Sequence, residues 1–234
     1  MSRCDDLKLK ILHSIAAAVF KVLKHPRISF EARLIEYHFV HSNIESDVRL
    51  KILDVGCAGA DLPIELANKG YGVYGIDAIP YHNQQNFTFV QGSLEHMPFD
   101  NDFFDIVTAV STIEHVGLGR YGDPISPDGD KKAVEEIKRI VKPGGKAIVT
   151  IPCGKDTICY SRDGVPLGRV YSSSSLVELL SGFKILEMSY IVKKKGIWLP
   201  ASMSEAERGV RYAKAEKVAM ASIALIVACK EEHQ

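Results

Sequence analysis

Hydrophobic residues recur along the chain with two different spacings, which predict helices at the beginning and a layered sheet further on. Over Leu7–Lys24 the apolar residues stand three or four positions apart, as on one face of a helix that ends before a His-Pro pair. A second helical pattern covers Phe30–His41. Beyond these, short apolar strands alternate with glycines and amphipathic helices, which is typical of a parallel sheet covered on both faces. We therefore expect a helical N-terminal extension over residues 1–48 and one α/β domain over residues 49–234.

The expected domain begins with five strands and continues into an antiparallel tail. The strands are expected at 50–55, 72–76, 87–91, 104–110 and 146–151, with helices at Leu62–Asn68 and Lys131–Val141. The segment Asp77–Phe87 is too short for a regular crossover helix and contains Pro80, so we expect an irregular connection there. The tail is expected to contain a loop (152–169), a helix (Ser174–Leu180), a strand (Lys184–Val192), a polar helical insert (203–217) and a last strand (218–229). The pattern thus predicts a doubly wound, mostly parallel seven-stranded sheet with an antiparallel C-terminal strand.

Composition and charge limit the classes of function. With 46% hydrophobic and 25% charged residues among 234, the chain is typical of a soluble globular protein. Its 29 Lys and Arg balance 29 Asp and Glu, which removes the general attraction of a basic domain for nucleic acid or anionic membranes. The apolar runs are too short to span a bilayer, and the five cysteines show no Cys-x-x-Cys spacing. We expect a cytoplasmic protein with free thiols, no membrane insertion and no nucleic-acid partner.

The segment with the clearest chemistry is Lys51–Pro63, an apolar strand that enters a glycine turn and then a helix. Such a turn lets a ligand lie against bare backbone at a helix N-terminus. About twenty residues later, Asp77 ends the second strand, where its carboxylate can accept hydrogen bonds from both hydroxyls of a ribose. Together the turn and the acid indicate a nucleotide-like cofactor.

These residues resemble the class I S-adenosylmethionine-dependent methyltransferases over residues 50–152. Leu53-Asp-Val-Gly-Cys57 is similar to the first motif of that family, and Gly75-Ile-Asp77 to the second. The segment 91–99, the strand 104–110 and the Lys-Pro-Gly-Gly turn at 142–145 follow in family order. The resemblance implies a Rossmann-like fold and S-adenosylmethionine as the cofactor. Two departures are that Ala58 and Ala60 replace glycines and that Ser93 replaces the usual adenine-binding acid.

The resemblance also implies roles for individual residues. Gly56, Cys57 and Gly59 would contact the methionine part of the cofactor through backbone, Asp54 would orient their loop, and Asp77 would bind the ribose. Ser93 and Leu94 would contact adenine. The full set of expected cofactor-binding residues is Asp54, Gly56, Cys57, Ala58, Gly59, Asp77, Ala78, Ser93, Leu94 and Val110.

The pair Glu114-His115 follows the fourth strand at the carboxyl edge of the sheet, where ligands of open α/β folds bind. We assign both residues as catalytic, with His115 as the candidate base for a hydroxyl acceptor. Ubiquinone-biosynthesis O-methyltransferases carry a similar pair preceded by another Glu and bind a divalent cation, whereas this chain has Ser111 there. A divalent cation on Glu114, His115 and Asp123 is allowed but not required. The alternative is that Glu114 is a loop or cofactor hydrogen-bond partner and His115 a packing residue.

The segment Gly117–Pro124 is a glycine-punctuated loop that we expect to recognise the acceptor. With Ser111–His115 it is similar to a little-characterised bacterial and archaeal group, some of whose members sit among surface-glycan genes. The expected substrate-binding residues are Arg120, Tyr121, Asp123 and, from the preceding helix, Tyr37. The alternatives are an ion pair of Arg120 with Asp123 or Asp128 and simple helix packing by Tyr37.

The sequence therefore predicts an enzyme, an O-methyltransferase for a small polar acceptor such as a hydroxyl of a sugar, a glycan precursor or a related metabolite. One alternative is a non-catalytic module that binds S-adenosylmethionine or a partner. Another is an NAD(P)-dependent dehydrogenase, which Tyr190 and Lys194 suggest by spacing, although they fall in an expected strand where that pair needs a helix. A homodimer is a further expectation. The acceptor, its reacting atom, the use of a metal and the role of His115 stay open.

Overall fold

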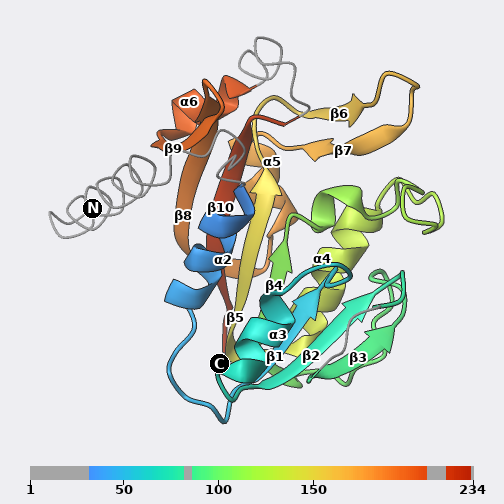
Figure 1. Cartoon of the computed structure of the whole chain (residues 1–234), viewed down its shortest axis with the longest axis vertical. Coiled ribbons are helices and arrows are strands. Elements are labelled where there is room, and N and C mark those ends of the chain that lie inside the picture. Colours follow the sequence, from blue (N-terminus) through green and yellow to red (C-terminus); the bar gives the residue numbers. More distant parts are fainter. Residues whose placement is uncertain (1–31, 82–85, 210–219, 233–234) are drawn as a thin grey trace, which may run out of the picture.

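The centre of the protein is an eight-stranded sheet, seen in a computed structural model that describes residues 32–81, 86–209 and 220–232 (Figure 1). The strand order is β3-β2-β1-β4-β5-β10-β8-β9. The strands of this sheet are β1 (Lys51–Val55), β2 (Gly72–Asp77), β3 (Thr88–Gln91), β4 (Phe104–Val110), β5 (Val141–Pro152), β8 (Phe183–Lys194), β9 (Ile197–Ala201) and β10 (Ser222–Lys230).

The first five strands are parallel, and their order reverses between β1 and β4. Strand β10 enters antiparallel between β5 and β8, and β9 pairs antiparallel with β8 at the edge. The predicted fold class, a doubly wound and mostly parallel sheet with an antiparallel C-terminal strand, is therefore confirmed. The reversal of strand order matters for function, because it opens a crevice at the carboxyl ends of β1 and β4.

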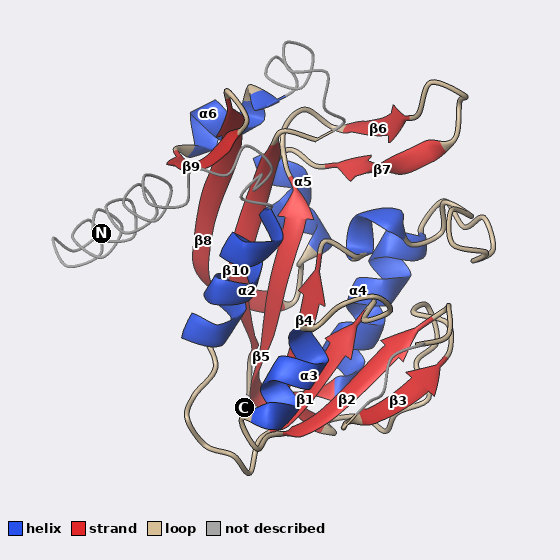
Figure 2. Cartoon of the chain, in the orientation of Figure 1, coloured by secondary structure: helices blue, strands red, loops and turns tan. Residues whose placement is uncertain are grey.

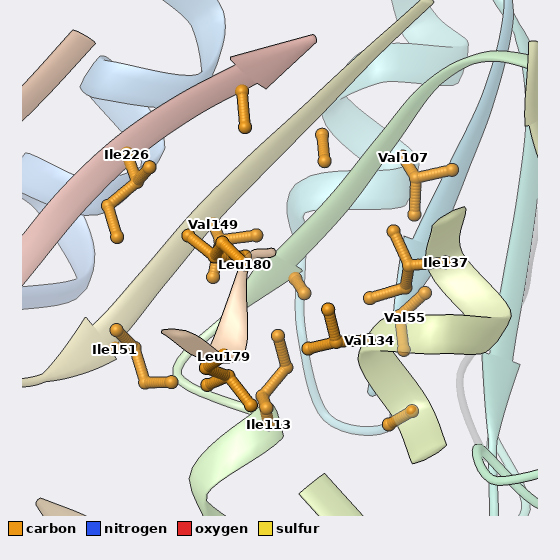
Figure 3. Close-up of a cluster of buried hydrophobic side chains, with 14 of the residues drawn as sticks. Val55, Val107, Ile113, Val134, Ile137, Val149, Ile151, Leu179, Leu180 and Ile226 are labelled. Carbon is orange, nitrogen blue, oxygen red and sulfur yellow. The ribbon is translucent and has the colours of Figure 1, made fainter. Parts of the chain in front are cut away.

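Helices cover both faces of the sheet. The helical elements are α2 (Ala32–Ser42), α3 (Leu62–Asn68), η1 (Ile113–His115, a 3-10 turn), α4 (Gly129–Ile140), α5 (Ser173–Leu179) and α6 (Met203–Glu207). Phe39 and Val40 of α2 pack with Leu62 and Leu66 of α3 in one buried cluster. Residues of α4 and α5 form the cluster on the opposite face, where Figure 3 shows Val134, Ile137 and Leu179 against the strands. None of the described helices is long and apolar enough to cross a membrane.

Two β elements differ from the sequence expectation. The loop expected at 152–169 contains a hairpin of β6 (Thr157–Tyr160) and β7 (Pro166–Val170), which forms a separate two-stranded sheet (Figure 2). The sheet has eight strands instead of seven because β9 adds an edge strand after the turn at Lys195-Gly196. The sequence did not predict β9 because this strand contains Pro200. Proline disfavours strands but is tolerated at a sheet edge.

The remaining predicted elements lie within a few residues of their expected bounds. Strand β5 begins at Val141 instead of 146, because Val141 pairs with Phe104 before the bulged Pro-Gly-Gly segment. The connection after Asp77 has no helix in its described parts, 78–81 and 86–87, as expected. The helix expected at Leu7–Lys24 and most of the insert expected at 203–217 lie outside the described residues, apart from α6.

Candidate functional site

A cavity of about 980 Å³ opens at the carboxyl ends of β1, β2 and β4. Its walls come from five places: the glycine turn after β1, the segment after β2, the segment after β3, the loop after β4, and helix α2. The volume falls at the upper end of the usual range for small-molecule sites, roughly 300 to 1,000 Å³. The position at the reversal of strand order is where open α/β sheets bind ligands.

The glycine turn is shaped by local backbone contacts. The N–H groups of Gly56 and Cys57 both donate to the carbonyl of Ile76, at 2.8 and 3.4 Å, which ties the turn to β2. Gly56 has φ +76°, and a Cβ there would meet Thr112 Cγ2 at 2.2 Å. Only glycine therefore fits at position 56, and the turn leaves its backbone open to the cavity.

Asp77 links the turn to the end of β2. Its Oδ2 accepts a hydrogen bond from the N–H of Ala58 at 2.8 Å, and its Oδ1 accepts one from the N–H of Ile79 at 3.1 Å. A carboxylate has about four acceptor sites, so further capacity remains for ribose hydroxyls. Ala78, Ser93 and Leu94, which were expected beside the cofactor, also line the cavity.

Asp54 is a buried acid at the floor of the cavity. Its Oδ1 accepts a hydrogen bond of 2.6 Å from Thr108 Oγ1 on the neighbouring strand β4. Burial raises the pKa of Asp54 to about 7, and the charge of Asp77 adds to this effect. The structure thus attaches Asp54 to β4 by a side-chain contact that the sequence did not indicate.

Helix α2 covers the opening of the glycine turn. Tyr37 lines the cavity, and its hydroxyl oxygen accepts a hydrogen bond of 3.2 Å from the N–H of Asp61. Burial raises the pKa of Tyr37 to about 12. Arg33, which the sequence did not indicate, also lines the cavity and donates from Nη1 to the carbonyl of Val110 at 2.9 Å. The N-terminal extension therefore contributes directly to the site.

The two residues of the pair Glu114-His115 lie differently with respect to the cavity. His115 lines the cavity, and burial lowers its pKa to about 4, so the imidazole is neutral near pH 7. Glu114 is 1% exposed and is absent from the described cavity lining; burial raises its pKa to about 8, and Glu36 adds to this effect. Its Oε2 has no hydrogen-bond partner among the described residues.

The loop Gly117–Pro124, named the acceptor loop after its expected role, is held from within by Asp123. Its Oδ2 accepts hydrogen bonds from the N–H groups of Gly117 and Gly119, at 2.8 and 3.3 Å, and its Oδ1 accepts one from Tyr121 at 3.1 Å. Tyr121 lines the cavity and packs edge-on against the ring of His115. Arg120 lies over the ring of Tyr121, and within the described residues it forms no ion pair with Asp123 or Asp128.

Arg169 of β7 anchors the same loop from outside. Its Nη1 donates to the carbonyl of Val116 at 2.6 Å, and its Nη2 donates to that of Pro127 at 3.2 Å. Its Nε lies 3.6 Å from Asp130 Oδ2, which also accepts a hydrogen bond from Tyr171. The hairpin, which was not expected from the sequence, thus holds the residues on both sides of the acceptor loop.

Most residues predicted from the sequence meet at this cavity. The predicted residues that line it are Asp54, Gly56, Ala58, Gly59, Asp77, Ala78, Ser93, Leu94, Val110, His115, Tyr121, Asp123 and Tyr37. Three predicted residues do not belong to the described lining: Cys57, Glu114 and Arg120. The thiol of Cys57 is directed instead toward Gly75 beneath the turn, and burial raises its pKa.

Some lining residues were missed, including Arg33, Ser111 and Glu95. Ser111 follows β4 directly, so its place at the carboxyl edge was a usable signal.

The metal candidates Glu114, His115 and Asp123 do not converge: within the described residues there is no group of three metal-binding side chains. Tyr190 and Lys194 of the dehydrogenase alternative lie on strand β8, away from the described cavity lining.

The chain is similar in sequence to curated proteins that are named methyltransferases. The chain is 30% identical over 140 residues to a protein of Azorhizobium caulinodans named ubiquinone biosynthesis O-methyltransferase, covering 53% of this chain and 55% of that one. It thus spans about half the length of this relative.

Solved structures extend the likeness across the sheet. A protein from Methanosarcina mazei titled an S-adenosylmethionine-dependent methyltransferase has a TM-score of 0.58 at 17% identity, over 83% of this chain and 97% of that one. The [4+2]-cyclase SpnF has a TM-score of 0.59 at 18% identity, over 86% and 82%. Since one of these is titled a cyclase, the likeness shows the fold and not the reaction.

One family model matches residues 88–214, which is more than half of the chain. Its match begins at β3 and includes β4, the acceptor loop, the hairpin and β9. The chain therefore belongs to the family described as "Caenorhabditis protein of unknown function, DUF268", and its described residues have the fold of class I S-adenosylmethionine-dependent methyltransferases.

Proposed function

We propose that this protein transfers a methyl group from S-adenosylmethionine to a hydroxyl of a small polar acceptor, such as a sugar, a glycan precursor or a related metabolite. The observation that carries the proposal is the single cavity that the glycine turn, the Asp77 carboxylate and the acceptor loop line together. The name of the Azorhizobium caulinodans relative supports oxygen as the reacting atom. The proposal includes a cytoplasmic location and requires no metal.

The residues of the cavity fit this cofactor. Gly56 and Gly59 line the cavity, and nothing lies within 4 Å of the position that a Cβ would take at Gly59, so a ligand can approach that backbone closely. Asp77 retains acceptor capacity for two ribose hydroxyls, and Leu94 and Ile79 offer apolar surface for a purine. When bound, S-adenosylmethionine supplies a methyl group on a positively charged sulfur, which a nucleophile attacks in line.

The protein contributes mainly by positioning and by excluding water. Tyr37 and Arg33 of α2 cover the cavity from one side, and Tyr121 and His115 bound it from the other. Holding the acceptor and the methyl group in line can supply most of the acceleration of such a displacement. The neutral imidazole of His115 can accept a proton, but a pKa of about 4 makes it a weak base.

The cofactor assignment is tested by calorimetric titration of S-adenosylmethionine into the wild-type protein, Asp77→Asn and Asp100→Asn. Asp100 is an exposed acid outside the described cavity lining, so it is the matched control. We expect micromolar binding to the wild type and the control, and affinity at least about tenfold lower in Asp77→Asn, because hydrogen bonds to a charged group are worth roughly 1.5–3 kcal/mol. No binding at millimolar ligand would overturn the proposal.

The alternative of a non-catalytic module is separated by product formation. The protein is incubated with S-adenosylmethionine and a panel of nucleotide sugars, methyl glycosides and 4-substituted phenols, and S-adenosylhomocysteine is measured. An enzyme forms S-adenosylhomocysteine in proportion to the acceptor added. Tight binding without product for any acceptor would favour the module.

A further inference from the structure

Glu36 of α2 is a buried carboxylate for which the chemistry above has no use. It is 2% exposed, and its Oε1 accepts hydrogen bonds from Ser111 Oγ at 2.5 Å and Thr150 Oγ1 at 2.6 Å. Its Oε2 lies 3.9 Å from Arg33 Nε. A carboxylate without partners would be very costly to bury, and these three groups supply two hydrogen bonds and a nearby positive charge to it. These contacts therefore fix the side chain of Glu36 inside the protein. One of its partners, Thr150, lies 114 residues away in sequence.

Ser111 connects this carboxylate to the cavity. It is the first residue after β4 and lines the cavity, while its hydroxyl donates to Glu36. Its φ of +48° is uncommon for a residue other than glycine and costs free energy. The N–H of Ser111 is held by the carbonyl and by Oγ1 of Thr150, at 2.9 and 3.0 Å, which maintains this conformation. Backbone strain of this kind concentrates at functional sites, where the surrounding contacts enforce it.

The two residues that the sequence suggested as catalytic, His115 and Glu114, are less suitable as the base. A general base works best with a pKa near the working pH. Burial lowers the pKa of His115 to about 4, which is far from neutral pH, and Glu114 is unsuitable by position because it lies outside the described cavity lining. The hydroxyl of Ser111, by contrast, joins the cavity to a carboxylate through one short hydrogen bond.

We propose that Ser111 contacts the acceptor hydroxyl and that Glu36 receives the proton through it, an inference that rests on the proposed methyl transfer. The acceptor oxygen forms a bond to the methyl carbon while the carbon–sulfur bond breaks and its electron pair stays on sulfur. The acceptor proton passes to Ser111 Oγ, and the Ser111 hydroxyl proton passes to Glu36 Oε1. Arg33 and Thr150 hold Glu36 in place throughout.

Four variants test this relay. Glu36→Gln keeps an oxygen that can accept from both hydroxyls but removes the base. Ser111→Gly removes the relaying hydroxyl at a position whose positive φ suits glycine. Thr150→Val removes the second hydrogen bond to Glu36, and Thr150 is a buried residue outside the described cavity lining. Glu178→Gln is the control, because it changes an exposed glutamate on α5. For each, kcat and KM with the best acceptor of the panel, the Kd for S-adenosylmethionine and the Tm are measured.

We expect kcat to fall about 100-fold or more in Glu36→Gln and Ser111→Gly, the usual size of a general-base contribution, with KM and Kd within about threefold of wild type. Glu178→Gln should match wild type, and Thr150→Val should lower Tm with a much smaller loss of kcat. An unchanged kcat in Glu36→Gln or Ser111→Gly would overturn the relay alone. A wild-type protein that turns over no acceptor would overturn the proposed function and the relay with it.

Discussion

The cofactor side and the acceptor side of the cavity are held in place by different kinds of contact. On the cofactor side, backbone groups of the turn bond to the adjacent strand β2 through Ile76 and Asp77. On the acceptor side, Asp123 holds the loop from within, and Arg169 of the distant strand β7 bonds to Val116 and Pro127. The contact of Ala58 with Asp77 on the first side spans 19 residues, whereas the contacts of Arg169 on the second side span 42 and 53 residues. The variants below test this difference, from the largest expected effect to the smallest.

Arg169→Met should have the largest effect on stability. The side chain is 8% exposed, and its removal leaves buried carbonyls and Asp130 without their cation. Breaking a buried ion pair in this way typically costs about 3–5 kcal/mol. Urea unfolding measures the loss, with Arg162→Met, an exposed arginine of the same hairpin connection, as the control. Equal stability of the two variants would mean that the hairpin does not hold the acceptor loop.

Gly56→Ala should come next and should act on the cofactor side. The new Cβ would meet Thr112 Cγ2 at 2.2 Å at a φ of +76°. We expect a loss of roughly 2–3 kcal/mol, of which backbone strain alone supplies about 1–2. Gly59→Ala is the matched control, because Gly59 has φ +77° with nothing within 4 Å of the added Cβ. Thermal unfolding should separate the two; similar Tm values would show that Thr112 yields easily.

Glu114→Gln should have a smaller effect that depends on pH. Burial raises the pKa of Glu114 to about 8, so the folded protein keeps a proton that the unfolded chain releases near pH 4.5. The folded state then binds more protons between these values, and the free energy of unfolding falls as pH rises through that window. Glutamine has no proton to lose, so the variant should gain on wild type from pH 6 to pH 9, by about 1–3 kcal/mol.

Denaturant unfolding of both proteins across that range measures this gain. His115 gives the opposite trend below about pH 6.5, since burial lowers its pKa, and His115 is present in both proteins and cancels in the comparison. A difference in stability that is independent of pH would show that Glu114 is not protonated in the folded protein.

Much of the fold was predictable because its signals are local. Strands β1, β2, β3 and β4 lie at or within two residues of the expected ranges, since each is a short apolar run bounded by turn residues. The hairpin β6–β7 was missed because two short strands are marginal by themselves. Arg169 secures this hairpin through contacts with the acceptor loop about 40 residues away, which no local pattern reports.

The candidate site divides in the same way. The glycine turn and Asp77 follow from motif spacing, because neighbouring parallel strands place their carboxyl ends side by side. Arg33 and Glu36 show no such spacing. They enter the site because α2 packs through Phe39 and Val40 on the face that also buries α3.

The sequence by itself determined the order of strands and helices, the open backbone of the Gly56 turn and the acid that faces it, because these depend on residue type and short spacing. Only the tertiary structure decided which polar groups are buried together. Glu36 meets Ser111 and Thr150 across 75 and 114 residues, and Glu114 lies outside the described cavity lining while His115 forms part of it. The reason is physical: burial and long-range packing set the partners and the pKa of an ionisable group, and neither is encoded in the residues beside it.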